Sequence, residues 1–296
     1  MSTTTAGFKN KVIVVTGAGG NFGREGCLYF VQRGAKVVAM DNNQAALEET
    51  ATYIKNQLSG SDDDDDDDVL DSLFVVACDV TDVTSVETAV DSAVKQFSRI
   101  DLCWNNAGYQ GQIKPTLEYD CKDFALVMNV NVTGMFIVLQ TIAKQMVKQQ
   151  KKDDDNNVEE PTKYSIVNTS SVAGLRGTPA MVAYASSKAA VLAMTVSTSK
   201  DLAPYNIRVN AISPALIGPG FMWDRQNELH AKSGSPYFAT DPNQVAQNKI
   251  NSVPMKRLGT IQEVLQSVSF LLSDESSYTT GTNLVIDGGM SAGLKC

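Results

Sequence analysis

The sequence predicts an α/β fold, with a doubly wound parallel sheet of seven strands and helices on both faces, in a single domain over residues 1–296. Short apolar runs rich in β-branched residues recur along the chain, and amphipathic stretches separate them. This alternation is typical of parallel strands buried by crossover helices. A glycine-rich turn directly after the first run supports the same fold. The expected strands span residues 12–16, 36–40, 73–78, 100–104, 165–169, 208–212 and 284–286.

The glycine-rich turn lies between the first expected strand and a helix expected from about Arg24 to Arg33. Such a turn lets backbone N–H groups approach a pyrophosphate, which rests on the positive end of the helix. Glycines also make plain tight turns, so the turn alone is weak evidence. In this context it predicts the dinucleotide-binding form of the sheet, the Rossmann fold. The residues expected to contact the cofactor here are Gly17, Gly19, Asn21, Phe22 and Gly23.

An acidic residue, Asp41, ends the second expected strand at about twenty residues beyond the glycines. A carboxylate in this place accepts both ribose hydroxyls of NAD and repels the 2′-phosphate of NADP. The sequence therefore predicts NAD as the cofactor. The alternative, that Asp41 caps a helix beginning near Asn43, does not explain its spacing from the glycines.

Tyr184 and Lys188 share one face of a helix expected over residues 180–203. A phenol, with its ordinary pKa of about 10, needs a neighbouring cation to act as a base near neutral pH. Lys188 can supply that cation, and the Ser171 hydroxyl can hold a reacting oxygen. The group predicts acid/base chemistry on a carbonyl or an alcohol. Taken alone, the pair also fits a solvated helix face with a snorkelling lysine.

Several motifs, in order along nearly the whole chain, resemble those of the short-chain dehydrogenase/reductase family. They are residues 16–23, 79–80, 105–108 and 131–134, together with Ser171, Tyr184 and Lys188. The resemblance implies a catalytic tetrad of Asn131, Ser171, Tyr184 and Lys188. It also implies cofactor contacts from Asp79, Val80, Asn106, Ala107, Gly108, Tyr184, Lys188, Pro214 and Ile217.

The chain departs from the family pattern at two places. Asn21 stands where the family has the middle glycine of the turn, and we expect it to adopt the left-handed geometry that asparagine tolerates. Residues 214–219 lack the threonine that the family places near the pyrophosphate, so that hydroxyl contact is in doubt, although the backbone of Ile217 can still reach the nicotinamide amide.

Within the family, residues 105–111 and 218–242 resemble the NAD-dependent xylitol dehydrogenases. The resemblance implies a substrate lid over residues 218–253 and interconversion of a polyol and a ketose, with xylitol and D-xylulose as the leading pair. Arg225 and Gln226 are further polar candidates in the lid, and His230 is expected to be structural. The expected substrate contacts are Ser171, Tyr184, Gln110 and Trp223.

The resemblance also implies a role for each catalytic residue. Tyr184 takes the hydroxyl proton while the hydride passes to the nicotinamide, and Lys188 lowers the pKa of Tyr184 and holds the ribose. Ser171 orients the substrate oxygen, and Asn131 positions a water that carries the proton out. Two other functions stay open. The protein could be a short-chain reductase for another substrate, such as a 3-oxoacyl thioester or a different sugar alcohol, or it could sense NAD without turning it over.

Charge and composition exclude several classes of partner. The net charge is −8, but Asp62 to Asp68 supply seven of the negative charges, so the rest of the chain is nearly neutral. No basic stripe is present, and we expect no nucleic-acid partner. The polar runs at residues 59–72 and 149–163 are expected to be disordered surface insertions, and neither has the pattern of a calcium loop. With one histidine in the chain, we expect no metal site.

Cysteine usage and hydropathy predict a cytoplasmic location without a membrane partner. The five cysteines show no C-x-x-C spacing and read as free thiols, and the N-terminus has no apolar core typical of a signal peptide. No segment of about 18 apolar residues occurs. The family resemblance implies a homotetramer or homodimer, formed through helices expected at residues 119–148 and 180–203 and through the C-terminal strand.

Overall fold

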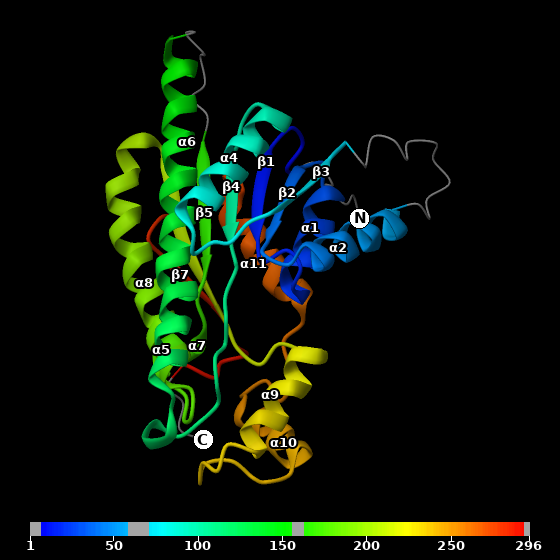
Figure 1. Ribbon diagram of the computed structural model, residues 1–296, viewed down its shortest axis with the longest axis vertical. Coiled ribbons are helices and arrows are strands. Elements are labelled where there is room, and N and C mark those ends of the chain that lie inside the picture. Colours follow the sequence, from blue (N-terminus) through cyan, green and yellow to red (C-terminus); the bar gives the residue numbers. More distant parts are fainter. Residues whose placement is uncertain (1–6, 59–70, 156–162, 293–296) are drawn as a thin grey trace.

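The computed structural model describes residues 7–58, 71–155 and 163–292, and only the backbone of residues 152–155. Its central sheet has seven parallel strands in the order β3-β2-β1-β4-β5-β6-β7 (Figure 1). The chain starts in the middle of the sheet, runs to one edge and then builds the other half, so the sheet is doubly wound. The strands are β1 (Val12–Thr16), β2 (Lys36–Asp41), β3 (Leu73–Ala77), β4 (Leu102–Asn105), β5 (Tyr164–Thr169), β6 (Ile207–Pro214) and β7 (Asn283–Ile286).

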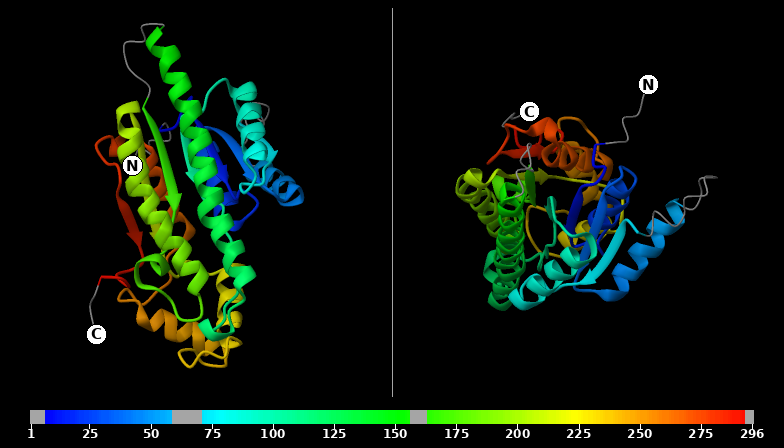
Figure 2. Two further views of the ribbon diagram at one scale, coloured as in Figure 1. Left: turned by 60° about the vertical axis from the view of Figure 1, so that its left-hand side comes forward. Right: turned by 90° about the horizontal axis from the view of Figure 1, so that it is seen from above.

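Helices cover both faces of this sheet and form two apolar cores. The first core joins α1 (Asn21–Val31), α2 (Gln44–Leu58) and α11 (Ile261–Leu272) to one face. The second joins α4 (Val83–Phe97) and α6 (Met135–Asp155) to the opposite face, where α8 (Val182–Leu202) lies beside α6 (Figure 2). Shorter helices are α5 (Cys121–Met128), α7 (Val172–Arg176), α9 (Phe221–Ala231) and α10 (Pro242–Ser252).

The two cores follow from the alternation of side chains along the strands. In β1, Ile13 and Val15 enter the first core, whereas Val12 and Val14 enter the second, and all four are at most 2% exposed. A strand buried on both faces must be apolar at every position, which is why these runs look continuous in the sequence. The prediction of a seven-stranded doubly wound domain is confirmed, with strand ends that differ by one to two residues from those expected.

The prediction of a disordered insertion from residue 149 is wrong for residues 149–155, because α6 continues to Asp155. The Gln149 side chain explains part of this extension. Its Oε1 accepts from the Ile100 N–H at 2.9 Å, and its Nε2 donates to the Ile100 carbonyl at 2.8 Å. The helix is thus fixed to the start of β4. Residues 59–70 and 156–162, which make up most of the two expected insertions, lie outside the described residues.

The helix expected over residues 119–148 is divided into three parts. Between α5 and α6 lies a π-helical segment, Asn129–Gly134, which contains Asn131. Segments of this type often occur at functional sites. By length and composition, the helical stretch Cys121–Lys151 is apolar enough to cross a membrane, and 39% of its apolar window is buried. Ile142 and Met146 of this stretch pack in the second core, so we assign it to the body of the domain.

The lid region lies beyond the carboxyl end of β6 and carries α9 and α10 (Figure 1). An isolated bridge between Ile217 and Gly259 closes its two ends, and Gly218 N–H donates to the Gly259 carbonyl at 2.9 Å. The lid therefore leaves and rejoins the domain at one place. This position lies at the edge where the carboxyl ends of parallel strands usually bind ligands.

Candidate active site

The expected site residues gather at the carboxyl ends of β1, β4, β5 and β6. The strand order reverses between β1 and β4, since β1 pairs with both β2 and β4. Open parallel sheets bind ligands in the crevice at this point. The turn after β1, the segment after β4 and the start of α7 after β5 all meet there, and the π-helical segment and α8 border them.

The glycine turn is shaped by backbone contacts that leave no room for side chains. Gly17 has a φ of 70°, and a Cβ atom there would lie 3.0 Å from the Ala107 Cα. At Gly23 a Cβ atom would lie 2.1 Å from the Gly17 carbonyl oxygen. Gly23 therefore lets α1 approach the turn, which is the packing role of the last glycine in such motifs.

The expectation that Asn21 adopts left-handed geometry is wrong. Asn21 is the first residue of α1, after an N-cap at Gly20, and it is not among the residues with positive φ. The turn needs left-handed geometry at Gly17 instead, where the chain leaves β1. An asparagine therefore fits at position 21 without strain.

The N-terminus of α1 has the properties of an anion-binding site. No side chain caps it, because the N-cap residue is Gly20. The first N–H groups of a helix lack intrahelical partners and carry a partial positive charge. They are thus free to receive the pyrophosphate of a dinucleotide, and the residues present fit such a cofactor.

Asp41 lies beside this turn at the end of β2. One carboxylate oxygen accepts from the Gly19 N–H at 3.0 Å, and the other accepts from the Asn43 N–H at 3.0 Å. The capping of α2 falls to Asn43, whose side chain accepts from the Ala46 N–H at 3.2 Å. Asp41 is therefore not the cap. It fixes the glycine turn and holds a negative charge where a ribose hydroxyl can donate.

The segment after β4 is fixed to β1 through Thr16. The Thr16 hydroxyl accepts from the N–H groups of Asn106 and Ala107, each at 2.9 Å, and Asn106 Nδ2 donates to the Thr16 carbonyl at 3.2 Å. A Cβ atom at Gly108 would lie 3.3 Å from Asn131 Oδ1 and 3.4 Å from Lys188 Nζ. Gly108 thus borders two of the expected catalytic residues directly.

Asp79 and Val80 follow β3 and differ in exposure. Asp79 is exposed, and its carboxylate accepts from the N–H and the hydroxyl of Thr81, at 2.9 and 2.7 Å. Val80 is buried against the π-helical segment, since a Cβ atom at Gly134 would lie 2.9 Å from Val80 Cγ2. Both lie at the carboxyl edge of the sheet, and their contact with adenine stays a prediction.

Ser171, Tyr184 and Lys188 come together between α7 and α8. Ser171 begins α7, where its hydroxyl accepts from the Ala173 N–H at 3.2 Å, and it also hydrogen-bonds the Tyr184 phenol. Lys188 is 3% exposed, and its ammonium donates to the Thr169 carbonyl at 2.8 Å. The Lys188 nitrogen lies 5.6 Å from the centre of the Tyr184 ring. Tyr184 and Lys188 thus lie on one helix, α8, and Lys188 is buried rather than solvated.

The pKa values differ from the expectation that Lys188 lowers the pKa of Tyr184. Burial raises the pKa of Tyr184, and the hydrogen bond from Ser171 opposes this rise. Burial also lowers the pKa of Lys188 to about 8. The reason is that both groups lie in a region of low polarity, where each charged form loses its water. In this protein without its cofactor, Ser171 is the group that favours the phenolate.

Asn131 is fully buried, and its side-chain hydrogen bonds are taken up by the protein. Its Oδ1 accepts from the Tyr109 N–H at 2.7 Å, and its Nδ2 donates to the Tyr109 carbonyl at 2.8 Å and to the Ser187 hydroxyl at 2.9 Å. Asn131 thus joins the segment after β4 to α8. Tyr109, Thr16 and Thr169 were not among the expected site residues. Thr16 carried a sequence signal as the residue before the glycine turn, and Tyr109 as part of residues 105–111.

Pro214 and Ile217 lie where β6 ends. The Ser171 hydroxyl is 3.5 Å from the Pro214 carbonyl, which places this segment beside the catalytic serine. Leu216 has a φ of 51°, and the bridge from Ile217 to Gly259 holds the segment at the base of the lid. The backbone of residues 214–217 is thus held by Ser171 at one end and by Gly259 at the other, which suits a segment expected to contact the cofactor ring.

The lid residues divide into one group at the site and one in the lid interior. Gln226 Nε2 donates to Gln110 Oε1 at 3.3 Å, so Gln110 touches the lid. Trp223 is 8% exposed, and the Lys249 ammonium lies 5.3 Å from its ring centre, which makes Trp223 a packing residue between α9 and α10. Arg225 is exposed. The expected substrate contact from Trp223 has no support in this geometry.

His230 belongs to the lid interior, as expected for a structural residue. Its Nδ1 lies 2.7 Å from the Gln226 carbonyl and 3.2 Å from the Lys249 nitrogen. Burial and the Lys249 charge lower the pKa of His230 to about 4, so it is neutral near pH 7. A neutral imidazole between α9 and α10 links the two lid helices without adding charge.

The fold and the site together define a class of enzyme. A doubly wound sheet with an uncapped helix N-terminus, an acidic residue at the end of β2 and a serine and tyrosine beside a buried lysine is the architecture of a nucleotide-dependent oxidoreductase. Comparison with known proteins names the family. Residues 17–291 match the family described as Enoyl-(Acyl carrier protein) reductase.

Three similar proteins cover almost the whole chain. The chain is 32% identical to levodione reductase of Leifsonia aquatica over 98% of each protein. It is 33% identical to the 3-oxoacyl-(acyl-carrier-protein) reductase of Thermotoga maritima, over 95% of this chain and 98% of that one. The crystal structure of an NAD⁺-bound xylitol dehydrogenase has 46% identity and a TM-score of 0.84, with 95% and 99% coverage. The protein belongs to the short-chain dehydrogenase/reductase family.

Proposed function

We propose that this protein is an NAD-dependent oxidoreductase that interconverts a polyol and a ketose, with xylitol and D-xylulose as the leading pair. The observation that carries the proposal is the group of Ser171, Tyr184 and buried Lys188 at the carboxyl edge of the sheet. The likeness to an NAD⁺-bound xylitol dehydrogenase, at 46% identity, supports the choice of substrate class. The charge of Asp41 beside the glycine turn supports NAD over NADP.

In the proposed reaction, bound NAD⁺ would accept a hydride from the carbon that carries the hydroxyl group. The Ser171 hydroxyl holds the substrate oxygen, and Tyr184 takes the hydroxyl proton as the C–H bond breaks. Because burial raises the pKa of Tyr184, its phenolate needs stabilisation. The Ser171 hydrogen bond supplies part of it. Asn131 positions a water molecule that carries the proton out of the site.

Two other functions are compatible with the same fold. A reductase of 3-oxoacyl thioesters would share the tetrad and differ in the lid, and one relative of that activity is 33% identical. An NAD sensor would keep the cofactor site and lose turnover. The complete set of Asn131, Ser171, Tyr184 and Lys188 favours an enzyme. Formation of NADH from any alcohol would exclude the sensor.

The role of Tyr184 is tested by Tyr184→Phe, with Ser186→Ala as a matched control. Ser186 lies two residues away on α8 and is exposed. We expect Tyr184→Phe to lower kcat by about 10²–10⁴-fold, the usual contribution of a positioned base, without a change in NADH affinity. Ser186→Ala should behave as the wild type. Retention of more than about a tenth of kcat by Tyr184→Phe would show that another group moves the proton.

We also propose that copies of the chain associate into a homotetramer or homodimer. Exposed apolar side chains lie along the helical stretch from α5 to α6 and on α8, where other members of the family form their long-helix contacts. They are Phe124, Leu126, Phe136 and Val196. Light scattering tests this against the monomer mass of 31.8 kDa. A cytoplasmic location is part of the proposal, since Cys27, Cys78, Cys103 and Cys121 are free thiols.

A further inference from the structure

Residues 109–112 cross the helical stretch that carries Asn131 and touch it at two points. The first point is Asn131 itself, whose side chain binds the backbone of Tyr109 on both its donor and its acceptor side. The second point is Asp123 on α5, eight positions before Asn131 in the sequence. The phenol of Tyr109 donates to Asp123 Oδ1 at 3.2 Å. A single residue, Tyr109, thus bridges Asp123 and Asn131.

Asp123 accepts from two further donors, one at the end of this loop and one in the segment just before α5. Its Oδ2 accepts from the Tyr119 phenol at 2.7 Å and from the Gln112 N–H at 2.8 Å. The negative charge of Asp123 contributes to raising the pKa of both Tyr109 and Tyr119, which keeps the phenols protonated as donors. The carboxylate therefore ties both ends of the loop to α5.

The chain between these bonds is pressed against α5. Gly111 has a φ of 72°, and a Cβ atom there would lie 2.4 Å from Val127 Cγ2 and 2.8 Å from Asp123 Oδ2. Position 111 therefore requires glycine, both for its backbone geometry and for space. We therefore expect residues 109–112 to move away from α5 if the Asp123 carboxylate is removed.

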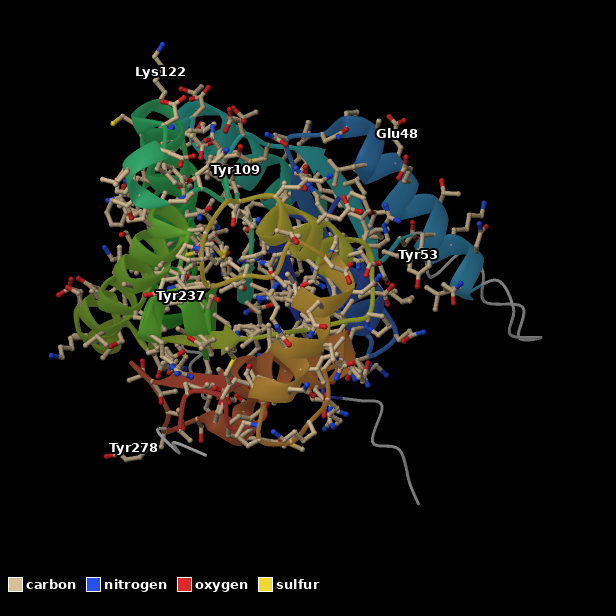
Figure 3. The ribbon with its side chains drawn as sticks, turned by 90° about the horizontal axis from the view of Figure 1, so that it is seen from below. Glu48, Tyr53, Tyr109, Lys122, Tyr237 and Tyr278 are labelled. Carbon is tan, nitrogen blue, oxygen red and sulfur yellow. The ribbon has the colours of Figure 1, made fainter. Side chains whose placement is uncertain are left out.

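The same loop also meets the lid. Gln110 accepts from Gln226 of α9, and the charge of Arg225 acts on the Tyr109 phenol. In Figure 3, Lys122 of α5 points away from the molecule, whereas Tyr109, which is 39% exposed, lies closer to the lid. The loop is thus placed between the proposed proton path at Asn131 and the proposed substrate lid.

We propose that Asp123 is a positioning residue, which fixes Tyr109 and through it the side chain of Asn131. The inference has two halves. The catalytic half, that Asp123 affects turnover through Asn131, rests on the proposed function, whereas the structural half, that Asp123 fixes Tyr109, is independent of it. Asp123 is not among the residues expected to contact the cofactor or the substrate. It acts at a distance by holding the backbone groups that orient the buried amide.

The structural half is tested by amide hydrogen exchange at Tyr109, in the full chain and without substrate. We expect Asp123→Ala to speed exchange of the Tyr109 amide by about tenfold or more, because residues 109–112 lose both of their bonds to this carboxylate. Tyr109→Phe removes one of the two bonds and should give a smaller increase in the same direction. The matched control is Asp120→Asn, since Asp120 is exposed, caps α5 and can be replaced by another good cap.

The catalytic half is tested by a double-mutant cycle. Asp123→Ala should lower kcat by about tenfold, since small displacements of catalytic groups cost this much or more. In an Asn131→Ala background the same change should have no further effect, because Asp123 acts through Asn131. NADH affinity should stay unchanged in all variants, which a general loss of structure would not allow.

Three results would overturn the inference. The first is exchange at Tyr109 that is the same in Asp123→Ala and in the wild type. The second is a kcat that Asp123→Ala leaves unchanged, and the third is effects of Asp123→Ala and Asn131→Ala that multiply. If the wild type turns over no alcohol or ketone, the proposed function fails, and the exchange measurement alone then decides whether Asp123 fixes the loop.

Discussion

Replacement of Gly23 by alanine tests how closely α1 packs on the cofactor turn. A Cβ atom at this position would lie 2.1 Å from the Gly17 carbonyl oxygen and 2.7 Å from the Ala18 Cα. Both neighbours are backbone atoms, so no flexible side chain can move aside. Ordinary contact starts at 3.4 Å, and the helix and the turn must therefore separate by about 1.3 Å.

Overpacking of this kind costs about 1–3 kcal/mol of folding free energy, which corresponds to a decrease in Tm of about 2–6 °C for a chain of this size. The displaced helix N-terminus should also weaken NADH binding by about tenfold or more. Thermal unfolding and a fluorescence titration with NADH measure the two effects. Gly7→Ala is the control, because a Cβ atom there meets nothing within 4 Å. A Gly23→Ala variant with the Tm and NADH affinity of the wild type would refute the packing argument.

Three further predictions follow from the site. Asp41→Ser should lower the preference for NAD over NADP, as a ratio of kcat/KM, by about tenfold or more, and an unchanged ratio would remove Asp41 from cofactor selection. Lys188→Met should abolish turnover yet raise the free energy of unfolding at pH 7 by up to about 3 kcal/mol, since burial lowers the Lys188 pKa from 10.5 to about 8. This gain should shrink as the pH rises from about 8 to about 10.5, where the wild-type amine becomes neutral in both states, and a constant gain in denaturant titrations would contradict it. Gln226→Leu should raise the KM for the polyol by about fivefold without changing the KM for NAD, and equal changes in both would place Gln226 outside the lid contact.

The sheet could be predicted from the sequence because its strands report their burial directly. A strand with four successive apolar residues, such as Val12 to Val15 of β1, is typical of a strand that lies between two covered faces. The glycine turn and Asp41 were predictable for a related reason. Their roles depend on residues close in sequence or at a fixed spacing along one βαβ unit.

Other features depend on contacts between distant segments and could not be read from the sequence. The polar run at Gln149 looks like a loop, but its amide pairs with the backbone of Ile100 and extends α6. The contact of the Lys249 ammonium with the Trp223 ring joins residues 26 positions apart and has no signal in the sequence. Asn21 was assigned the wrong backbone geometry because the strained position of the turn is Gly17.

The Tyr184 pKa shows a further limit of sequence reasoning. The spacing of Tyr184 and Lys188 was sufficient to place them on one face of α8. It could not predict the direction in which the pKa of each group is shifted. Burial of both groups raises the pKa of Tyr184 and lowers that of Lys188, and burial is a property of the whole fold.

The central claim, that this protein is an NAD-dependent polyol dehydrogenase, is tested most directly by initial rates over a panel of substrates. The panel should contain xylitol and other polyols with NAD and NADP, and D-xylulose and a 3-oxoacyl thioester with NADH and NADPH. We predict the highest kcat/KM for a polyol and ketose pair, with NAD preferred over NADP. A higher kcat/KM for the acyl thioester than for D-xylulose would contradict the claim.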